Sequence, residues 1–308
     1  MYDIVTSKTD FKNYNVFIQE SKSIDKDVIN FLKDNNVNGI SLEMEEKILP
    51  NVDFLSEITQ LEFLDLGRKS YGNLKAVEKL VNLEYLSLEG SCEESLDLSK
   101  LIKLQDFFVL YNKKIENIFD CVNLKRLIIH HYKKKNVDEF VKLEKLKILG
   151  IWSSPIQNID GLKDLKEIEQ LKLRYLSKLE SIDGIKNNSS VKELWIQNCK
   201  KVNDWEVLGT LSNLRVLTIE ACGNIPSLKF LDKLEFLESI RLVSNTFIED
   251  GKLSWLIDKE SMKYFNTPIE NHYDISLETL SKFNTFGVRN NLQFLTCVEK
   301  KYKRNRSI

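Results

Sequence analysis

Two histidines and three lysines lie close together in the sequence, where His130-His131 is followed by Lys133-Lys134-Lys135. Imidazoles bind metal ions and lysines bind phosphate, so this is the first place to look for chemistry. Neighbouring residues of a strand point to opposite faces, however, so the two imidazoles are poorly placed to share one metal. The lysines follow the predicted strand, in a turn where charged runs are usually solvated. We therefore predict no metal site here.

The remaining signals for catalysis are weak. His272 lies in a predicted loop and has no Cys or Ser partner that can be identified from the sequence. The motifs G-x-x-x-x-G-K-[ST], G-x-S-x-G, H-E-x-x-H and C-x-x-C do not occur in the sequence. The stretch after residue 264 is short for a catalytic domain. We expect a protein that is not an enzyme and that needs no cofactor.

The elements that position these residues follow one repeated pattern, which is clearest in Leu143–Leu165. Its apolar residues are spaced L-x-x-L-x-x-L-x-L and then I-x-x-I-x-x-L-x-x-L, which fits neither a helix nor a strand alone. A short strand followed by an apolar return segment fits both halves. Such a unit is one coil of a solenoid, because its apolar edges are buried only when another coil stacks on it.

The strand pair of this coil, Leu149 and Ile151, recurs along the chain at short and nearly equal steps. We expect an edge coil at Ile40 and Leu42 and a degenerate last coil at Met262 and Tyr264. The intervening pairs are Leu64/Leu66, Leu86/Leu88, Phe107/Val109, Leu127/Ile129, Leu171/Leu173, Leu194/Ile196, Leu217/Ile219 and Ile240/Leu242.

This L-x-x-L-x-L-x-x-N/C pattern resembles the leucine-rich repeat proteins, in particular their short-repeat, internalin-like subclass of bacterial type. The resemblance covers roughly residues 37 to 264 and implies an α/β solenoid, a horseshoe with a parallel β-sheet on its concave face and irregular or 3₁₀ segments on its convex side. In this family the N/C position looks inward and bonds the backbone of the next turn. Cys199, Cys222, Asn112 and Asn245 occupy that position. We therefore expect buried thiols there, as also at Cys121, and not disulfides or metal ligands.

The same register assigns side chains to the concave face, because alternate residues of a strand point outward. Aromatic and apolar residues gather there with basic residues on the C-terminal side, a composition typical of a protein-binding surface. The alternative is that the aromatic rings pack across strands and only stiffen the sheet. The predicted binding residues are Phe63, Tyr85, Phe108, Leu110, Ile128, Ile148, Trp152, Lys172, Arg174, Trp195 and Arg241.

Both ends of the repeat array need covering. We predict an N-terminal cap over residues 1–36, with a strand at Tyr14–Gln19 and a helix whose apolar stripe includes Val28 and Leu32. About ten coils follow over residues 37–265. A C-terminal cap and basic tail occupy residues 266–308, with Asp274 as the cap of a helix that has Ile275, Leu277, Leu280 and Phe283 on its apolar side. Leu292–Val298 reads equally well as a strand or the start of a helix, and the final KKYKRNRSI is either a solvated tail or a nucleic-acid contact.

Composition and charge limit the classes of partner that the chain is expected to bind. The 308 residues include 45 basic and 46 acidic ones, a formal net charge of −1, so no global field favours nucleic acid or an anionic membrane. No apolar run is long enough to span a bilayer. The start MYDIVTSKTD lacks the basic and apolar regions of a signal peptide. We therefore expect a cytoplasmic, non-catalytic scaffold that binds another protein on its concave face, with an inhibitor or immunity-type role as the favoured one. The alternatives are a surface adhesion protein like the internalins and a nucleic-acid-contacting adaptor.

Overall fold

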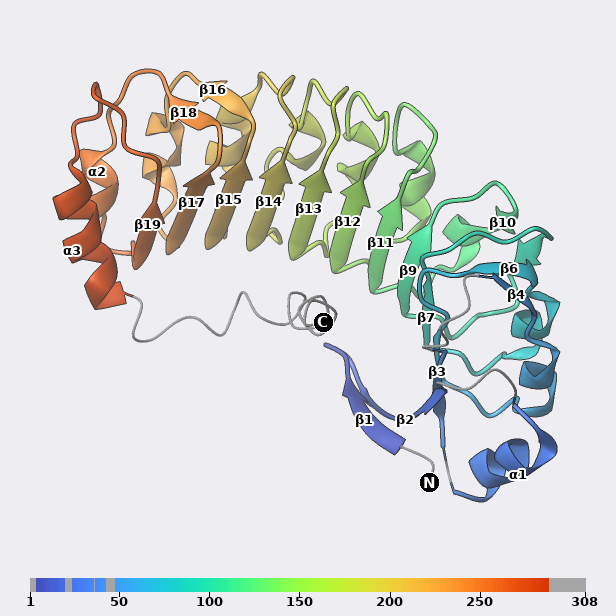
Figure 1. Cartoon of the computed structure of the whole chain (residues 1–308). Coiled ribbons are helices and arrows are strands. Elements are labelled where there is room, and N and C mark those ends of the chain that lie inside the picture. Colours follow the sequence, from blue (N-terminus) through green and yellow to red (C-terminus); the bar gives the residue numbers. More distant parts are fainter. Residues whose placement is uncertain (1–3, 20–23, 36, 43–47, 288–308) are drawn as a thin grey trace.

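The computed structural model describes residues 4–19, 24–35, 37–42 and 48–287. These residues form one curved solenoid, with the long sheet lining its inner side and short helices on its outer side (Figure 1). The two ends differ: a β-hairpin and helix α1 lie at the N-terminal end, whereas helix α3 lies beside the last strand (Figure 1). The predicted fold class, an α/β solenoid with a concave parallel sheet, is confirmed.

The inner sheet has 13 strands among the described residues, and all neighbours are parallel except β1 and β2. In spatial order they are β1 (Ile4–Lys8), β2 (Asn13–Gln19), β3 (Gly39–Leu42), β5 (Phe63–Asp65), β7 (Tyr85–Leu88), β9 (Asp106–Leu110), β11 (Arg126–His130), β12 (Ile148–Trp152), β13 (Gln170–Arg174), β14 (Glu193–Gln197), β15 (Val216–Glu220), β17 (Ser239–Val243) and β19 (Tyr264–Asn266). Two-strand ladders join neighbouring coils away from this sheet: β4 (Ile48–Asn51) with β6 (Ser70–Asn73), β8 (Leu96–Asp97) with β10 (Ile115–Glu116), and β16 (Gly223–Ile225) with β18 (Thr246–Ile248).

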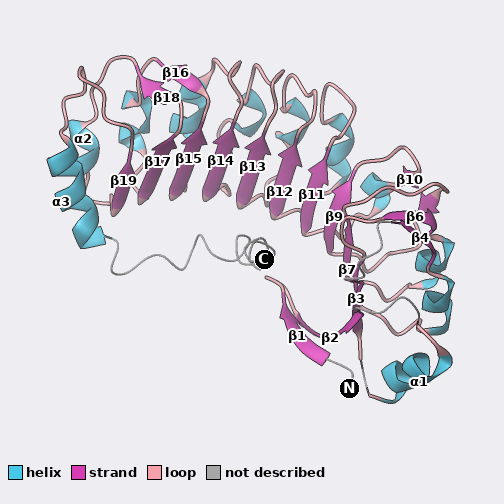
Figure 2. Cartoon of the chain, in the orientation of Figure 1, coloured by secondary structure: helices cyan, strands magenta, loops and turns pink. Residues whose placement is uncertain are grey.

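The return segments contain short 3₁₀ helices, as predicted, because so short a coil leaves no room for a longer helix (Figure 2). Their apolar residues are buried in the same core as the strand leucines, so each coil is closed only by its neighbours. The 3₁₀ helices span Asp53–Glu57, Lys75–Lys79, Ile118–Asp120, Asp138–Lys142, Asp160–Leu162, Asp183–Ile185, Trp205–Thr210 and Lys229–Lys233. Within the described residues, three α-helices complete the fold: α1 (Lys26–Asp34), α2 (Ser254–Ile257) and α3 (Leu277–Gly287).

The strand register agrees with the predicted leucine pairs over most of the array. Leu149 pairs with Leu127 on one side and with Leu171 on the other, and both members of each pair are buried. The prediction was wrong for the last coil, where Phe265, not Tyr264, pairs with Ile240. The step from Ile240 to Phe265 is longer than the step from Leu217 to Ile240, because α2 is inserted in the return segment.

A residue with positive φ follows each of six successive strands, from β11 to β17. Its φ lies between 52° and 56°, in the left-handed region that L-residues rarely adopt. This corner turns the chain out of the sheet in the same way in each of these six coils, so the outward rows of their strands stay in register. The corner residues are His131, Ser153, Tyr175, Asn198, Ala221 and Ser244.

The N/C position faces inward as expected in most of these coils. The Sγ atom of Cys199 lies 3.6 Å from the carbonyl oxygen of Leu173, and Asn112 donates to the carbonyl of Cys92 at 3.2 Å. The prediction was wrong for Asn245, which is exposed. The next residue, Thr246, is buried there instead, and its hydroxyl accepts a hydrogen bond from the backbone of Cys222 at 3.3 Å.

The N-terminal end is covered by α1, whose Val28, Ile29 and Leu32 are buried against the first coil. Asp25 caps this helix by accepting a hydrogen bond from the backbone of Val28 at 3.0 Å. The predicted strand at Tyr14–Gln19 is confirmed, and it joins the repeat sheet directly by pairing with β3. The division of the chain at residues 36 and 265 stays a prediction.

At the C-terminal end, α3 packs against β19. The side chain of Asn284 in α3 donates a hydrogen bond to the backbone oxygen of Phe265 at 2.7 Å and accepts one from its backbone nitrogen at 3.1 Å. It thereby pairs backbone groups of β19 that no further strand pairs among the described residues. The predicted capping role of Asp274 was wrong: Ser276 accepts from the backbone of Thr279, and Asp274 instead accepts from Leu253 and Ser254 at the start of α2. Leu277 is 68% exposed and does not belong to the apolar side of the helix. Leu292–Val298, Cys297 and the basic tail lie outside the described residues.

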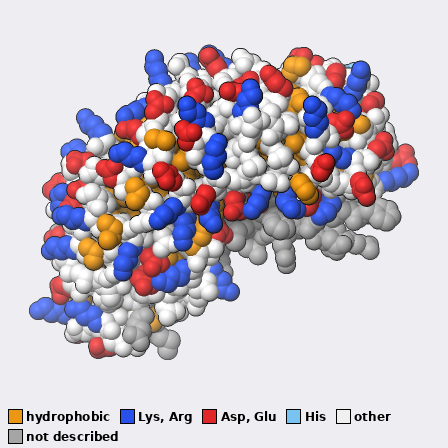
Figure 3. Space-filling view, turned by 180° about the vertical axis from the view of Figure 1, so that it is seen from behind, with side chains coloured by type: hydrophobic (Ala, Val, Ile, Leu, Met, Phe, Trp, Pro, Cys, Tyr) orange, Lys and Arg blue, Asp and Glu red, His pale blue; other side chains and the backbone are white. Residues whose placement is uncertain are grey.

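The face seen from behind carries interspersed basic and acidic side chains, with hydrophobic side chains singly or in small groups (Figure 3). Exposed ion pairs join neighbouring coils, for example Lys192 with Glu169 at 2.8 Å and Arg215 with Glu238 at 2.8 Å. Each such exposed pair contributes little to stability. In the part of the chain that the structure describes, no helix is long and apolar enough to cross a membrane.

Candidate functional site

The eleven predicted binding residues all lie on the concave face of the sheet, but they are not equally accessible. The predicted exposure was wrong for four of them, which are buried with 2 to 8% of their surface exposed: Phe63, Tyr85, Ile128 and Ile148. The other seven are half-buried: Phe108, Leu110, Trp152, Lys172, Arg174, Trp195 and Arg241. The surface that a partner could contact is therefore smaller than predicted, and it is shifted toward the C-terminal coils.

Phe63 and Tyr85 are buried by a second, small core on the concave side. Their rings are stacked with centroids 4.1 Å apart, and Tyr14 of β2 lies 5.2 Å from Phe63. Val16 completes this cluster, and Phe108 packs against it from β9. At this end of the face the aromatic residues pack across strands, which was the alternative left open by the sequence.

The tip of the β1–β2 hairpin fixes this arrangement by three charged contacts. Lys12 lies 2.9 Å from Glu62 and 3.2 Å from Glu84, at the N-terminal ends of β5 and β7. Burial lowers the pKa of Lys12, but the hydrogen bonds to these two carboxylates outweigh it and raise the pKa. Asp10 pairs with Arg126 of β11. The hairpin thus spans the N-terminal strands from β2 to β11.

Arg126 is also the partner of a buried acid. Its Nε atom lies 3.4 Å from Oδ1 of Asp106, and the two side chains are only 10% and 2% exposed. The guanidinium stacks near two rings, with its Cζ 5.3 Å from the centroid of Phe11 and 5.6 Å from that of Phe108. A buried carboxylate requires such a partner, so Arg126 serves the stability of this end of the face.

A different arrangement occupies the middle of the face, where Arg174 lies between Trp152 and Trp195. The Cζ atom of Arg174 is 4.7 Å from the Trp152 ring and 4.3 Å from the Trp195 ring, both within cation–π range. The Nε–H of Arg174 donates to the side-chain oxygen of Gln197 on the next strand. We call Trp152, Arg174 and Trp195 the tryptophan cluster. All three side chains are half-buried and project from adjacent strands of one sheet, so the spacing of their Cα atoms is set before any partner arrives.

Gly150 makes room for this cluster. A Cβ atom placed there would lie 2.7 Å from Cδ1 of Ile128 and 3.2 Å from Nε1 of Trp152, so both side chains lean over the glycine. His130 lies beside Trp152 at a centroid distance of 4.2 Å, with its ring edge-on. Burial lowers the pKa of His130 to about 4, and the charges of His131, Arg68 and Arg174 act in the same direction. The imidazole is therefore neutral at pH 7.

The flank of the cluster carries opposite charges. Lys172 precedes Arg174 by two residues on β13. Trp195 lies opposite Lys172 on the neighbouring strand β14. Burial raises the pKa of Glu193 on that strand, and Lys172 partly offsets the increase. Leu110 and Arg241 are half-buried but each lies on the second strand away from the nearest tryptophan, so they extend the face without joining the cluster.

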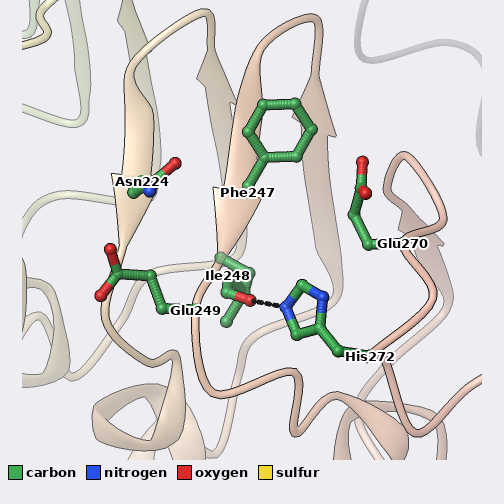
Figure 4. A pocket seen from close by; sticks show the side chains of 6 residues that line it. All are labelled: Asn224, Phe247, Ile248, Glu249, Glu270 and His272. Atoms are coloured by element: carbon green, nitrogen blue, oxygen red, sulfur yellow. Dashed lines mark hydrogen bonds between the residues drawn. The ribbon is translucent and has the colours of Figure 1, made fainter.

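The structure offers little chemistry elsewhere. Among the described residues, no group of three His, Cys, Asp or Glu side chains is arranged to hold a metal ion. A pocket of about 590 Å³ lies outside the concave face, lined by Asn224, Phe247, Ile248, Glu249, Glu270 and His272 (Figure 4). His272 points to the carbonyl oxygen of Ile248, 3.0 Å from its Nε2, while the two carboxylates lie on either side of that pair (Figure 4). No nucleophile and base are brought together in this pocket.

Sequence reasoning missed the hairpin residues Asp10, Phe11 and Tyr14 as part of the concave face. One signal was present: Tyr14 and Val16 alternate with Phe17, so both faces of the predicted strand are apolar. A strand that is buried on both faces needs a layer on its second side. In the structure Phe17 faces the repeat core, and Tyr14 and Val16 face the concave side.

No family model matches the chain, and no curated protein matches its sequence. The solved structures that are similar to it include an internalin and a leucine-rich repeat protein. An internalin, InlF, of Listeria monocytogenes superposes with a TM-score of 0.62 at 16% identity, over 88% of this chain and 85% of that one. A leucine-rich repeat protein of Leptospira interrogans gives a TM-score of 0.55 at 14% identity, over 80% of this chain and 69% of that one. Together with the repeated leucine pairs and the 3₁₀ return segments, these similarities show that the chain has the internalin-like leucine-rich repeat fold.

Proposed function

We propose that this protein is a non-catalytic scaffold that binds another protein on its concave face, around the tryptophan cluster. The observation that carries this proposal is the contrast between the two halves of the face. Phe63 and Tyr85 are buried by the hairpin, whereas Trp152, Arg174 and Trp195 stay half-exposed on strands of the same sheet. Tryptophan and arginine side chains held in place on a preformed surface are the residues that dominate protein-binding energies.

The mode of action that fits this surface is steric. A rigid sheet loses little conformational entropy when a partner docks, so it favours a stable complex that covers part of the partner. We therefore favour an inhibitor or immunity-type role, in which the chain masks an enzyme or toxin. The test is whether the captured partner loses its activity when the purified chain is added in equimolar amounts.

The binding surface is tested by replacing both indoles. Affinity capture from the source cells, followed by mass spectrometry, is compared for the unaltered chain and for the double variant Trp152→Ala, Trp195→Ala. We expect the double variant to lose the captured protein while its urea unfolding curve shows a folded domain. Trp255→Ala is the matched control, because Trp255 lies on α2, outside the concave face, where its Nε1 donates to the carbonyl of Lys252. Equal capture by all three proteins would refute the proposed surface.

We also propose that the protein acts in the cytoplasm. The four described cysteines are buried free thiols, and burial raises the pKa of Cys199 to about 12 and that of Cys222 to about 11. Such thiols are neutral and unreactive, which suits a reducing compartment. Fractionation of the source cells with an antibody against the chain tests this location, and recovery only in the medium or at the cell surface would refute it.

A further inference from the structure

We propose that the tryptophan cluster is a receptor for one acidic side chain, Asp or Glu, of the partner protein. This inference rests on the proposed function and adds the chemistry of the contact. It starts from Arg174, whose guanidinium is held between two indole rings and whose Nε–H is engaged by Gln197. Within the described part of the chain its two terminal nitrogens make no hydrogen bond, and their planar geometry matches a carboxylate.

The charge of Arg174 is not neutralised within the described part of the chain. No carboxylate lies within 4.0 Å of it there, and Gln197 is an uncharged partner. Three other arginines among the described residues differ in this respect: Arg126 pairs with Asp106 and Asp10, Arg68 with Glu89, and Arg215 with Glu238. A half-buried cation without a counter-ion is costly to desolvate further unless the partner brings a negative charge.

The indoles supply a second argument. Nε1 of Trp152 and Nε1 of Trp195 are both buried, and neither has a hydrogen-bond partner among the described residues. An N–H group without an acceptor is unfavourable, and most buried ones are satisfied. The N–H of Trp152 lies over Gly150, so it gains an acceptor only if the ring turns. A carboxylate at Arg174 offers a second oxygen to such a turned indole.

The surroundings favour a single carboxylate over a polyanion. Glu193 and Glu220 lie on the neighbouring strands β14 and β15, within the same sheet. They would repel a phosphate backbone but leave room for one side chain placed directly at Arg174. The expected ligand is therefore an exposed Asp or Glu, with an apolar neighbour that packs on an indole ring.

Short peptides provide a probe that does not require the natural partner. A random 12-residue peptide library is panned on the full chain, and enriched peptides are synthesised with Glu or Gln (Asp or Asn) at the recurring acidic position. Affinities are measured by fluorescence anisotropy for the unaltered chain, Arg174→Gln, the double variant Trp152→Ala, Trp195→Ala, and the control Arg215→Gln. Arg215 is an exposed arginine outside the concave rows.

We expect the unaltered chain and Arg215→Gln to prefer the acidic peptide over its amide by at least about tenfold, and Arg174→Gln to bind both peptides equally. Arg174→Lys should restore part of the preference, because it keeps the charge but not the planar stacking. Intrinsic tryptophan fluorescence should change on binding of the acidic peptide, because the indoles turn. The amide should produce a smaller change at equal occupancy.

The outcomes separate this inference from the proposed function. Peptides that need both tryptophans but bind equally as acid and amide would overturn the acidic ligand and leave the binding face intact. Peptides that bind the double tryptophan variant unchanged, or no enriched peptides at all, would count against the face itself. Displacement of the acidic peptide by a synthetic peptide of residues 288–308, or dimerisation of the chain that Arg174→Gln abolishes, would overturn the assignment to a partner protein.

Discussion

Asp10, in the turn between β1 and β2, pairs with Arg126 of β11, a residue 116 positions later in the chain. In a solenoid each coil normally contacts only its two neighbours. This ion pair instead links the hairpin to a strand five places along the sheet, because the hairpin tip crosses the concave side. The N-terminal coils are thereby tied into one unit, and the C-terminal coils are not.

Removing Arg126 should destabilise the protein far more than removing Asp10. Arg126→Met leaves the carboxylate of Asp106, which is 2% exposed, without its nearest cation, and we expect a loss of about 3–5 kcal/mol. Asp10→Asn should cost less than about 1 kcal/mol, because the Asp10 side chain is 43% exposed. Urea unfolding of both variants measures the difference. Equal losses would mean that the buried pair is not the dominant contact.

Acid should destabilise the fold through His130. The folded chain keeps this imidazole neutral down to about pH 4, whereas the unfolded chain protonates it near its ordinary pKa of 6.5. Between these values the unfolded state binds more protons, so the contribution is complete above pH 6.5 and is lost as the pH falls toward 4. Because the ring is only half-buried, we expect an effect of about 1–2 kcal/mol.

Urea unfolding at pH 7 and pH 4.5 checks this sign. His130→Gln should lose less stability than the unaltered chain between the two pH values. His131→Asn is the control, because His131 is exposed and its φ of 55° suits asparagine. An unchanged difference between the unaltered chain and His130→Gln at both pH values would contradict the assigned pKa.

Glycine at a positive-φ corner should stabilise the protein. Ala221 has a φ of 52°, which costs an L-residue about 1–2 kcal/mol that glycine does not lose. Glycine is more flexible in the unfolded chain, so we expect Ala221→Gly to gain up to about 1 kcal/mol. Ala76→Gly is the matched control: Ala76 is buried in the helix Lys75–Lys79, and there glycine should cost about 0.5–1 kcal/mol. Thermal melts of the two variants should move in opposite directions.

A charge in the leucine ladder should unfold the middle coils. Leu149 is fully buried between Leu127 and Leu171, so Leu149→Asp leaves an unpaired carboxylate in the core. We expect a loss of more than about 3 kcal/mol. Lys145→Asp is the control, since Lys145 is exposed in the same coil. A loss of less than about 1 kcal/mol for Leu149→Asp would refute the register.

Periodicity was sufficient to predict the coils because each one is stabilised by local spacing. The pairs from Ile40 to Leu242 are set by short, regular steps, so their register could be counted from the sequence. The last coil could not be placed in this way, because the insertion of α2 lengthens its step. Asp274 illustrates the same limit: its partners Leu253 and Ser254 lie 20 residues or more before it, and only the folded chain brings them together.

The outward-facing strand positions of the candidate site were predicted from the sequence, but the exposure of their side chains was not. The strand period correctly gave the outward direction of Phe63 and Tyr85. Their burial depends on Tyr14 and Val16, which reach them through a hairpin that no repeat pattern describes. The stacking of Arg174 also depends on both neighbouring strands: Trp152 lies directly opposite it on β12, whereas Trp195 lies diagonally from it on β14. Spacing within one strand does not reveal this arrangement.

Because the six corners have nearly equal φ, each coil between them adds the same length to the concave face. Asn198 and Ala221 have nearly the same φ, so the coils that such corners delimit are interchangeable units of length. Deleting or copying one unit C-terminal to β14 would shift Arg241 relative to Trp195 by one inter-strand distance, about 4.8 Å, without altering the tryptophan cluster. A protein of this design can therefore match partners of different size by gaining or losing whole coils. The side chains on each remaining strand keep their geometry.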